Sequence, residues 1–318
     1  MRIQSKRIAG TYWFRLPKAY NPAPTSAAEC AHVIEGRVYI WAGDHTRSRT
    51  YVWLRVGSLL TMAESSPKLI KSDKVFSDTA SSIHYGAPHT VAAFAFAKIN
   101  QCSHATDCAI VCLNTAGRGG TSSVALSRIC RSRFEFLLPA LFAQQYRSEL
   151  TQFVARCDRR GVLPYHRPDG TTDRLPPWLR AIVQDYPRVT FYGYTANPNR
   201  DRLSADLPNY STVFSRKETA RNHEHCAQVW ARGVSLSVVV SEDVKQYVMF
   251  SRNISPRPEW LNVRFVDYDR HDIRHPDFDG AQNIGLLTPK GKAKRDRSGF
   301  VIQTVGAFAG FVRGLIRG

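Results

Sequence analysis

Apolar runs alternate with amphipathic stretches along most of the chain after residue 120. Runs rich in Val, Ile, Tyr and Phe predict strands at 162–167, 189–195, 210–215, 234–240, 260–269 and 283–288. Apolar residues at helical spacing predict helices at 122–161, 176–187 and 216–233. Pro139 divides the first of these into two helices, and Gly161 stops the second one. Because apolar strands alternate with helices, the pattern predicts an α/β core with a mainly parallel sheet, either an incomplete (β/α) barrel or an open sheet.

The two ends of the chain depart from this pattern. Residues 1–95 are β-rich, with strand-like runs at 32–43 and 49–57, and we expect them to form an N-terminal extension packed on a core at 96–302. Residues 303–318 form an apolar tail whose glycines are four apart, at Gly306, Gly310, Gly314 and Gly318. On a helix these glycines share one face and permit close helix–helix approach, which suits self-association or a peripheral membrane contact. The alternative is a packed or unstructured terminus.

The chain carries a large positive charge. Of its 318 residues, 44 are Lys or Arg and 26 are Asp or Glu, so the formal net charge is +18. Such an excess favours a polyanionic partner, with DNA or RNA ahead of a membrane surface, because neutralised phosphates release their counterions. We expect the nucleic-acid contacts at Arg118, Lys290, Lys292, Lys294 and Arg295. The chain has neither the apolar run of a signal peptide nor an 18-residue uncharged apolar span, so we expect a cytoplasmic protein.

Three cysteines lie close together, at Cys102, Cys108 and Cys112. In a chain without a secretory signal, such thiols favour a metal or an iron–sulfur cluster over disulfides. A zinc site needs a fourth ligand, which His104 or Cys130 would supply. Three cysteines alone would leave one iron of a [4Fe–4S] cluster open to a small molecule. The alternative is that all three are ordinary buried cysteines.

A glycine-rich turn follows the cysteines and leads into a helix. We expect Gly117, Arg118 and Gly119 to form an anion or cofactor site, because amides at a helix N-terminus bind negative charge. Polar residues also gather where the predicted strands end, which is the edge that carries the site in parallel α/β proteins. They supply a candidate pocket made of Asp169, Asp173, Tyr194, Arg200 and Asp269. Carboxylates in such a pocket also suit Mg²⁺ or Mn²⁺.

The motifs together resemble a known family. LNTAGRGG (113–120), FYGYTANPNR (191–200), LPNYSTVFSRKE (207–218) and the segment from 266 to 302 resemble an uncharacterised family of phage and plasmid proteins. That family also carries three cysteines ahead of an AGRG turn, and it is distantly similar to the phage gene product 88 domain. The resemblance covers about residues 100–302. It implies a phage-related origin, a host-cell setting and an α/β core with the cysteines at one end.

The order of these features also resembles the radical SAM superfamily, in which a three-cysteine loop precedes a helix and a series of βα units. This likeness implies a [4Fe–4S] cluster and S-adenosylmethionine as cofactors. The superfamily spacing is Cys-x3-Cys-x2-Cys, whereas the spacing here is Cys-x5-Cys-x3-Cys.

Three hypotheses of function follow. The first is a phage-type nucleic-acid-binding protein with a three-cysteine metal or cluster site, active in replication or processing of the element's DNA. The second is a radical-SAM-like enzyme that acts on a small molecule or a nucleotide. The third is a non-catalytic DNA-binding or replication-initiation protein with structural cysteines. The sequence leaves open whether the protein is an enzyme.

Overall fold

The structure is a computed structural model of the 318-residue chain. The described residues are 4–8, 11–15, 27–41, 53–57, 59–62, 80–85, 90–94, 97–113, 116, 121–170, 172–251, 256 and 258–317. The glycine-rich turn with Gly117, Arg118 and Gly119 lies outside them, so the anion site predicted there stays a prediction.

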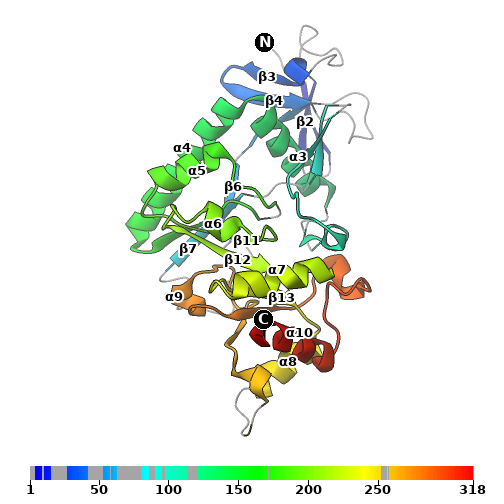
Figure 1. Cartoon of the computed structure of the whole chain (residues 1–318). Coiled ribbons are helices and arrows are strands. Elements are labelled where there is room, and N and C mark those ends of the chain that lie inside the picture. Colours follow the sequence, from blue (N-terminus) through cyan, green and yellow to red (C-terminus); the bar gives the residue numbers. More distant parts are fainter. Residues whose placement is uncertain are drawn as a thin grey trace.

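The main sheet is mostly parallel. Within the described residues its order is β14-β15-β13-β12-β11-β10-β7-β6, and every neighbouring pair from β14 to β7 is parallel. Only β6 pairs antiparallel, at the edge beside β7. The strands are β6 (Leu60–Met62), β7 (Ala80–Tyr85), β10 (Leu163–Arg167), β11 (Thr190–Thr195), β12 (Tyr210–Ser215), β13 (Leu236–Val239), β14 (Phe265–Asp267) and β15 (Ile284–Leu287). The strands and their helices form an incomplete barrel (Figure 1), which confirms the predicted α/β fold class.

Helices join the parallel strands and cover the outer face of the sheet. The predicted break at Pro139 separates α3 (Ser122–Leu137) from α4 (Pro139–Arg160), and Gly161 ends α4 in the left-handed conformation at φ 65°. The other helices are α5 (Pro177–Asp185), α6 (Arg200–Leu203), α7 (Ala220–Trp230), α8 (Glu242–Ser251), α9 (Pro276–Asp279) and α10 (Val305–Arg317). Helix α7 starts four residues later than predicted, because Thr219 caps it by accepting from the Asn222 amide.

Two apolar cores lie between the sheet and these helices. One joins α3, α4 and α5 to β11 through residues such as Phe142, Phe153 and Phe191. The other joins α7, α8 and α10 to the strands β12 to β15 through residues such as Val238 and Phe308. Because successive side chains of a strand alternate between the two faces, Phe191 faces the helices while Tyr192 and Tyr194 face the inner side of the incomplete barrel.

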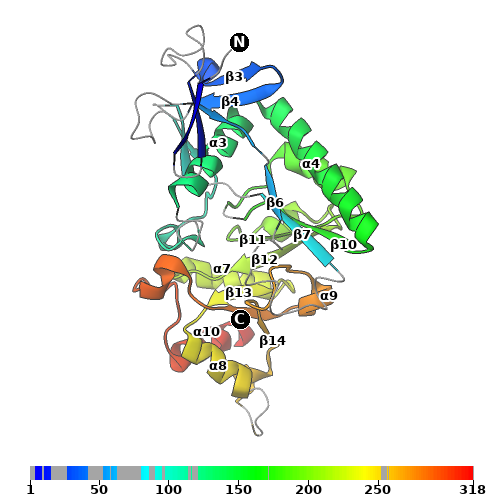
Figure 2. The ribbon, with the colours of Figure 1, turned by 180° about the vertical axis from the view of Figure 1, so that it is seen from behind.

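A second sheet lies at the N-terminal end of the molecule (Figure 2), in the order β1-β2-β5-β4-β3. Its strands are β1 (Gln4–Ile8), β2 (Thr11–Arg15), β3 (Ala31–Ile34), β4 (Arg37–Trp41) and β5 (Trp53–Arg55), and β8 (Thr90–Phe94) pairs separately with β9 (Ala97–Asn100). The β-rich N-terminal extension is therefore present. The boundary at residue 95 stays a prediction, although β6 and β7 come from before it and join the main sheet.

Two predicted strands were wrong in detail. The run at 32–43 is the β3–β4 hairpin, turned at Glu35 and Gly36, which have φ of 51° and 70°. The run at 260–269 holds only the short β14, because its first residues form the 3-10 helix η8 (Glu259–Asn262), which buries Trp260 and Leu261.

The tail is a packed helix. Helix α10 buries Phe308, Val312 and Leu315 against the second core. A side-chain carbon at Gly306 or Gly310 would meet nothing within 4 Å, so the glycine face points away from this core. Contact of that face with a membrane or a second copy stays a prediction. Among the described residues, no helix is both long and apolar enough to span a lipid bilayer.

Candidate functional site

The cysteine loop (residues 101–113) lies at the C-terminal edge of the main sheet. The amide of Asp173, in the loop that follows β10, donates to the Gln101 carbonyl over 2.9 Å. The Lys217 ammonium, two residues after β12, donates to the His104 carbonyl. The next residue, Glu218, accepts from the Asp107 amide through Oε1 over 3.1 Å. The loops after two parallel strands therefore hold the cysteine loop where such sheets carry their sites.

The three thiols share one electrostatic environment. Cys102, Cys108 and Cys112 are all partly buried, whereas the other described cysteines are fully buried. Burial raises the pKa of the Cys102 thiol to about 12, and the charge of Asp173 raises it further. Lys217 acts in the opposite direction, and the other two cysteines raise the value. Within the described part of the chain, no group of three or more His, Cys, Asp or Glu side chains surrounds a point that would hold a metal ion.

The basic loop (residues 290–297) packs directly against the cysteine loop. Its 3-10 helix η9 (Gly291–Arg295) buries Ala293 in a small apolar cluster with Val111 of the cysteine loop and with Val301. A side-chain carbon at Gly291 would lie 2.9 Å from the Ala116 Cα, so the basic loop also touches the backbone at Ala116, three residues after the end of the cysteine loop. The cations predicted for this loop, Lys290, Lys292, Lys294 and Arg295, are all exposed.

Asp269 holds the base of the basic loop. Its carboxylate accepts from Lys290 over 2.8 Å, from Lys245 over 2.9 Å, and from both the amide and the hydroxyl of Thr288. Burial alone would raise the pKa of Asp269, but the hydrogen bonds from the two lysines and the threonine outweigh it and lower the pKa to about 2. Asp269 is thus an anchored anion whose carboxylate already has partners in the chain.

Asp169, Asp173 and Arg200 lie together, but on the helix side of the sheet. Arg200 donates to Asp173 over 2.9 Å, and Asp173 also accepts from the Thr195 hydroxyl and the Ala196 amide, each over 2.8 Å. Asp173 therefore fixes the turn after β11.

Asp169 is 3 % exposed and lies against Gly193, where an added side-chain carbon would collide with its Oδ1. Burial raises the pKa of Asp169 to about 7, although the Arg200 guanidinium opposes the shift. Since Gly193 has the same strand phase as Phe191, this carboxyl group lies between sheet and helices and not in the barrel.

Tyr194 occupies the inner face, apart from these carboxylates. The Arg167 guanidinium lies 4.7 Å from the centre of the Tyr194 ring, and burial raises the pKa of the phenol. Arg167 also donates to Asp272 over 3.0 Å, and the Tyr192 hydroxyl donates to the same carboxylate over 3.2 Å. These contacts join β10 and β11 to the segment between β14 and β15.

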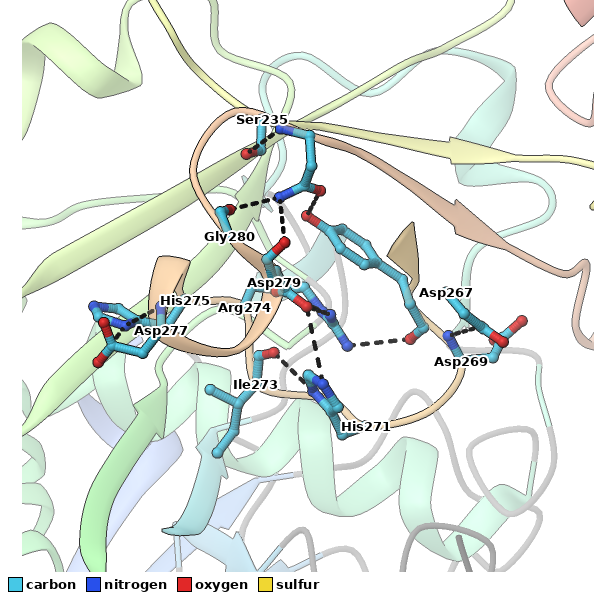
Figure 3. Close-up of polar contacts among 12 residues, drawn as sticks. Ser235, Asp267, Asp269, His271, Ile273, Arg274, His275, Asp277, Asp279 and Gly280 are labelled. Atoms are coloured by element: carbon cyan, nitrogen blue, oxygen red, sulfur yellow. Dashed lines mark hydrogen bonds and ion pairs between the residues drawn. The ribbon is translucent and has the colours of Figure 1, made fainter. Parts of the chain in front are cut away.

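That segment, the crossover segment (residues 268–283), is braced by its own polar groups (Figure 3). Arg274 donates to both oxygens of Asp279, over 2.9 and 3.1 Å, and to the carbonyl of Tyr268 over 3.1 Å. The Tyr268 hydroxyl in turn donates to the Asn283 side chain over 2.8 Å. His271 lies beside this group, with Nε2 3.9 Å from Asp279. The crossover segment covers the inner face of β10 and β11, where Ile273 and Phe278 pack with Tyr165 and Tyr192.

The residues that organise this edge were not singled out from the sequence, although polar residues were expected to gather where the strands end. Lys217 and Glu218 fall in a stretch predicted to be helix, and nothing local distinguishes them from solvent-facing charges. Arg167 and Arg274 are 8 % and 0 % exposed, which is unusual for arginine. The carboxylate partner of Arg167 is Asp272, which is distant in the sequence, and that of Arg274 is Asp279, across a turn. The predicted set of five thus separates into the Asp169–Asp173–Arg200 group, Tyr194 inside the barrel, and Asp269 under the basic loop.

These observations define an α/β half-barrel protein with a cysteine loop and a basic loop side by side at its strand ends. A family model described as Gene product 88 matches residues 59–304, more than three quarters of the chain, and the chain belongs to that family. The match confirms the resemblance to the phage gene product 88 domain and is consistent with a phage protein. No curated protein and no solved structure matches the chain.

Proposed function

We propose that the protein is a phage enzyme acting on nucleic acid, in which Cys102, Cys108 and Cys112 hold a [4Fe–4S] cluster and the basic loop binds phosphate groups. The observation that carries this proposal is the contact between the two loops. Ala293 packs on Val111, and Gly291 approaches Ala116, so the loop that carries the exposed cations touches the cysteine loop next to Cys112. A polyanion bound by those cations would lie next to whatever the thiols hold.

The donor set favours a cluster over zinc. A structural zinc ion needs four ligands around one point, and the described residues offer no such group. The thiolates of a cubane cluster each bind a different iron and are therefore spread more widely. Three thiols that share an environment without converging fit this second arrangement. Lys217 lies close enough to lower the pKa of Cys102, so one cation already faces the negative charge that the cluster would bring.

A cluster held by three cysteines supplies one-electron chemistry and leaves one iron for a ligand such as S-adenosylmethionine. The chain's own residues would provide the rest of the site. Lys292, Lys294 and Arg295 would bind the phosphates. The proposed setting is replication or processing of the element's own DNA in the host cell.

Anaerobic purification followed by iron, sulfide and zinc analysis tests the cluster. We expect about four irons and four sulfides per chain, with loss of the cluster absorbance in Cys112→Ala. Cys226→Ala is the matched control, because Cys226 is fully buried in the second core, outside the cysteine loop. One zinc per chain and no iron would contradict the cluster and would indicate a structural zinc site instead. A stable, metal-free parent protein would refute a three-cysteine site of either kind.

The salt dependence of nucleic-acid binding tests the basic loop. The triple variant Lys292→Ala, Lys294→Ala, Arg295→Ala should bind more weakly, and its log-affinity against log-salt slope should fall by roughly 0.7–0.9 for each phosphate that it no longer neutralises. Arg188→Ala is the control, since this exposed arginine pairs with Asp158 just before β11, at the opposite edge of the sheet. Equal slopes for the triple variant and the parent would refute the phosphate-binding role. A steep salt dependence of nucleic-acid binding that does not change when iron is absent would favour a non-catalytic DNA-binding protein.

A further inference from the structure

Two adjacent residues, Lys217 and Glu218, hold the cysteine loop from the turn between β12 and α7. The Lys217 ammonium donates to the His104 carbonyl, and Glu218 Oε1 accepts from the Asp107 amide over 3.1 Å. His104 and Asp107 both lie between Cys102 and Cys108. The two contacts therefore fix the backbone of the segment that sets the separation of these thiols.

Lys217 is itself held rigidly. Its amide donates to the Asn222 side chain over 2.6 Å, and its carbonyl lies 2.9 Å from His223 Nε2. The His223 ring packs on Phe311 of α10 at 5.7 Å between centroids. Asn222 and His223 thus tie the lysine backbone to helix α7, and His223 ties it to Phe311 beside the second core.

The charge of Lys217 has no carboxylate partner among the ion pairs of the described residues. Lys217 is 4 % exposed, which is rare for a lysine outside an ion pair. Burying an ammonium group is costly unless an opposite charge accompanies it. The three cysteines are the nearby groups that become anions when they bind metal.

We propose that Lys217 is a positioning residue for the bound cluster: with Glu218 it clamps the cysteine loop, and its ammonium is the counter-charge of the cluster. The counter-charge rests on the proposed function, whereas the clamp on the cysteine loop does not. A fixed positive charge beside a cluster stabilises the reduced, more negative state and so raises the reduction potential. The clamp, in contrast, exists without metal.

Two measurements on the full-length chain separate these parts. In metal-free protein, hydrogen exchange of amides 104–108 should be at least about tenfold faster in Lys217→Met and in Glu218→Ala than in the parent. Glu218→Gln keeps an acceptor for the Asp107 amide and should restore protection. Arg188→Met, the matched loss of one exposed charge, should leave exchange unchanged. Unchanged exchange in both clamp variants would overturn the clamp.

In anaerobically reconstituted protein, Lys217→Met should bind as much iron and sulfide as the parent. Its cluster should have a lower midpoint potential, measured by a redox titration that is monitored by electron paramagnetic resonance. We expect at least about a tenfold fall in the ratio of reduced to oxidised cluster at a fixed potential, equal to about 59 mV for one electron. Lys217→Arg should recover most of the shift, and Arg188→Met should show none. A parent-like potential in Lys217→Met would overturn the counter-charge. If the parent takes up no iron, the proposed function and the counter-charge fall together, and the exchange data alone decide the clamp.

Discussion

Replacing Asp169 with asparagine should change how stability depends on pH. Asp169 is 3 % exposed, and burial raises its pKa from 3.8 to about 7, against the opposing charge of Arg200. The folded state therefore binds this proton more tightly than the unfolded state does. The stability contributed by the protonated group is complete below about pH 4 and is lost as the pH rises to about 7.

The size of the effect follows from the difference between these two pKa values. About three pKa units at 1.36 kcal/mol each amount to about 4 kcal/mol, which is an upper limit for the whole pH range. The asparagine side chain would be neutral at every pH and nearly the same shape. Asp169→Asn should thus match the parent near pH 4 and exceed its free energy of unfolding by up to about 4 kcal/mol at pH 8.

Urea unfolding of both proteins between pH 4 and pH 8 measures this difference. Asp158→Asn is the control, because Asp158 is an exposed partner of Arg188 and should give a small difference that does not grow with pH. A gap between Asp169→Asn and the parent that stays constant across the range would refute the raised pKa. A gap that shrinks with rising pH would show that the ionised carboxylate stabilises the fold.

Three further outcomes follow from close contacts. Gly285→Ala should lower the free energy of unfolding by about 1–3 kcal/mol or more, measured by urea denaturation, because the new carbon would overlap the Tyr268 ring. Phe308→Ala should cost about 3–5 kcal/mol in the same assay, since this α10 ring is fully buried in the second core. Asp269→Asn should weaken the attachment of Lys290, so protease cleavage in the basic loop should speed up. Asp269→Asn should also have a lower free energy of unfolding than the parent at neutral pH. This difference should disappear as the pH falls from about 4 towards 2, where the parent carboxylate becomes protonated.

Local signals were enough to predict much of the fold. Pro139 and Gly161 mark helix boundaries through their own backbone restrictions, so α3 and α4 could be read from the sequence. The apolar runs that became β10 to β13 are bounded by turn residues. The β3–β4 hairpin was missed because Glu35 adopts a left-handed conformation more usual for Gly or Asn. Trp260 and Leu261 suggested a strand by their apolarity, yet a 3-10 helix buries them equally well.

The candidate site was harder to predict, because the direction of a side chain depends on pairing and not on composition. Asp169 and Tyr194 both belong to strand ends, but one packs behind the sheet and the other faces the barrel. The contact of Lys217 with His104 joins residues 113 positions apart, and no local pattern records it. The proximity of the basic loop and the cysteine loop likewise appears only once the sheet has brought their strands together.

The strand order has a consequence for how the chain is made. Strand β15 lies between β13 and β14, although β14 is synthesised first. In the finished sheet β14 pairs with β15, so β14 has no place to dock until residues 284–287 leave the ribosome. Meanwhile the backbone groups along the β13 edge stay unpaired, and an open edge of this kind invites pairing with other nascent chains. The crossover segment is synthesised in that interval, and its Arg274–Asp279 pair joins residues only five positions apart.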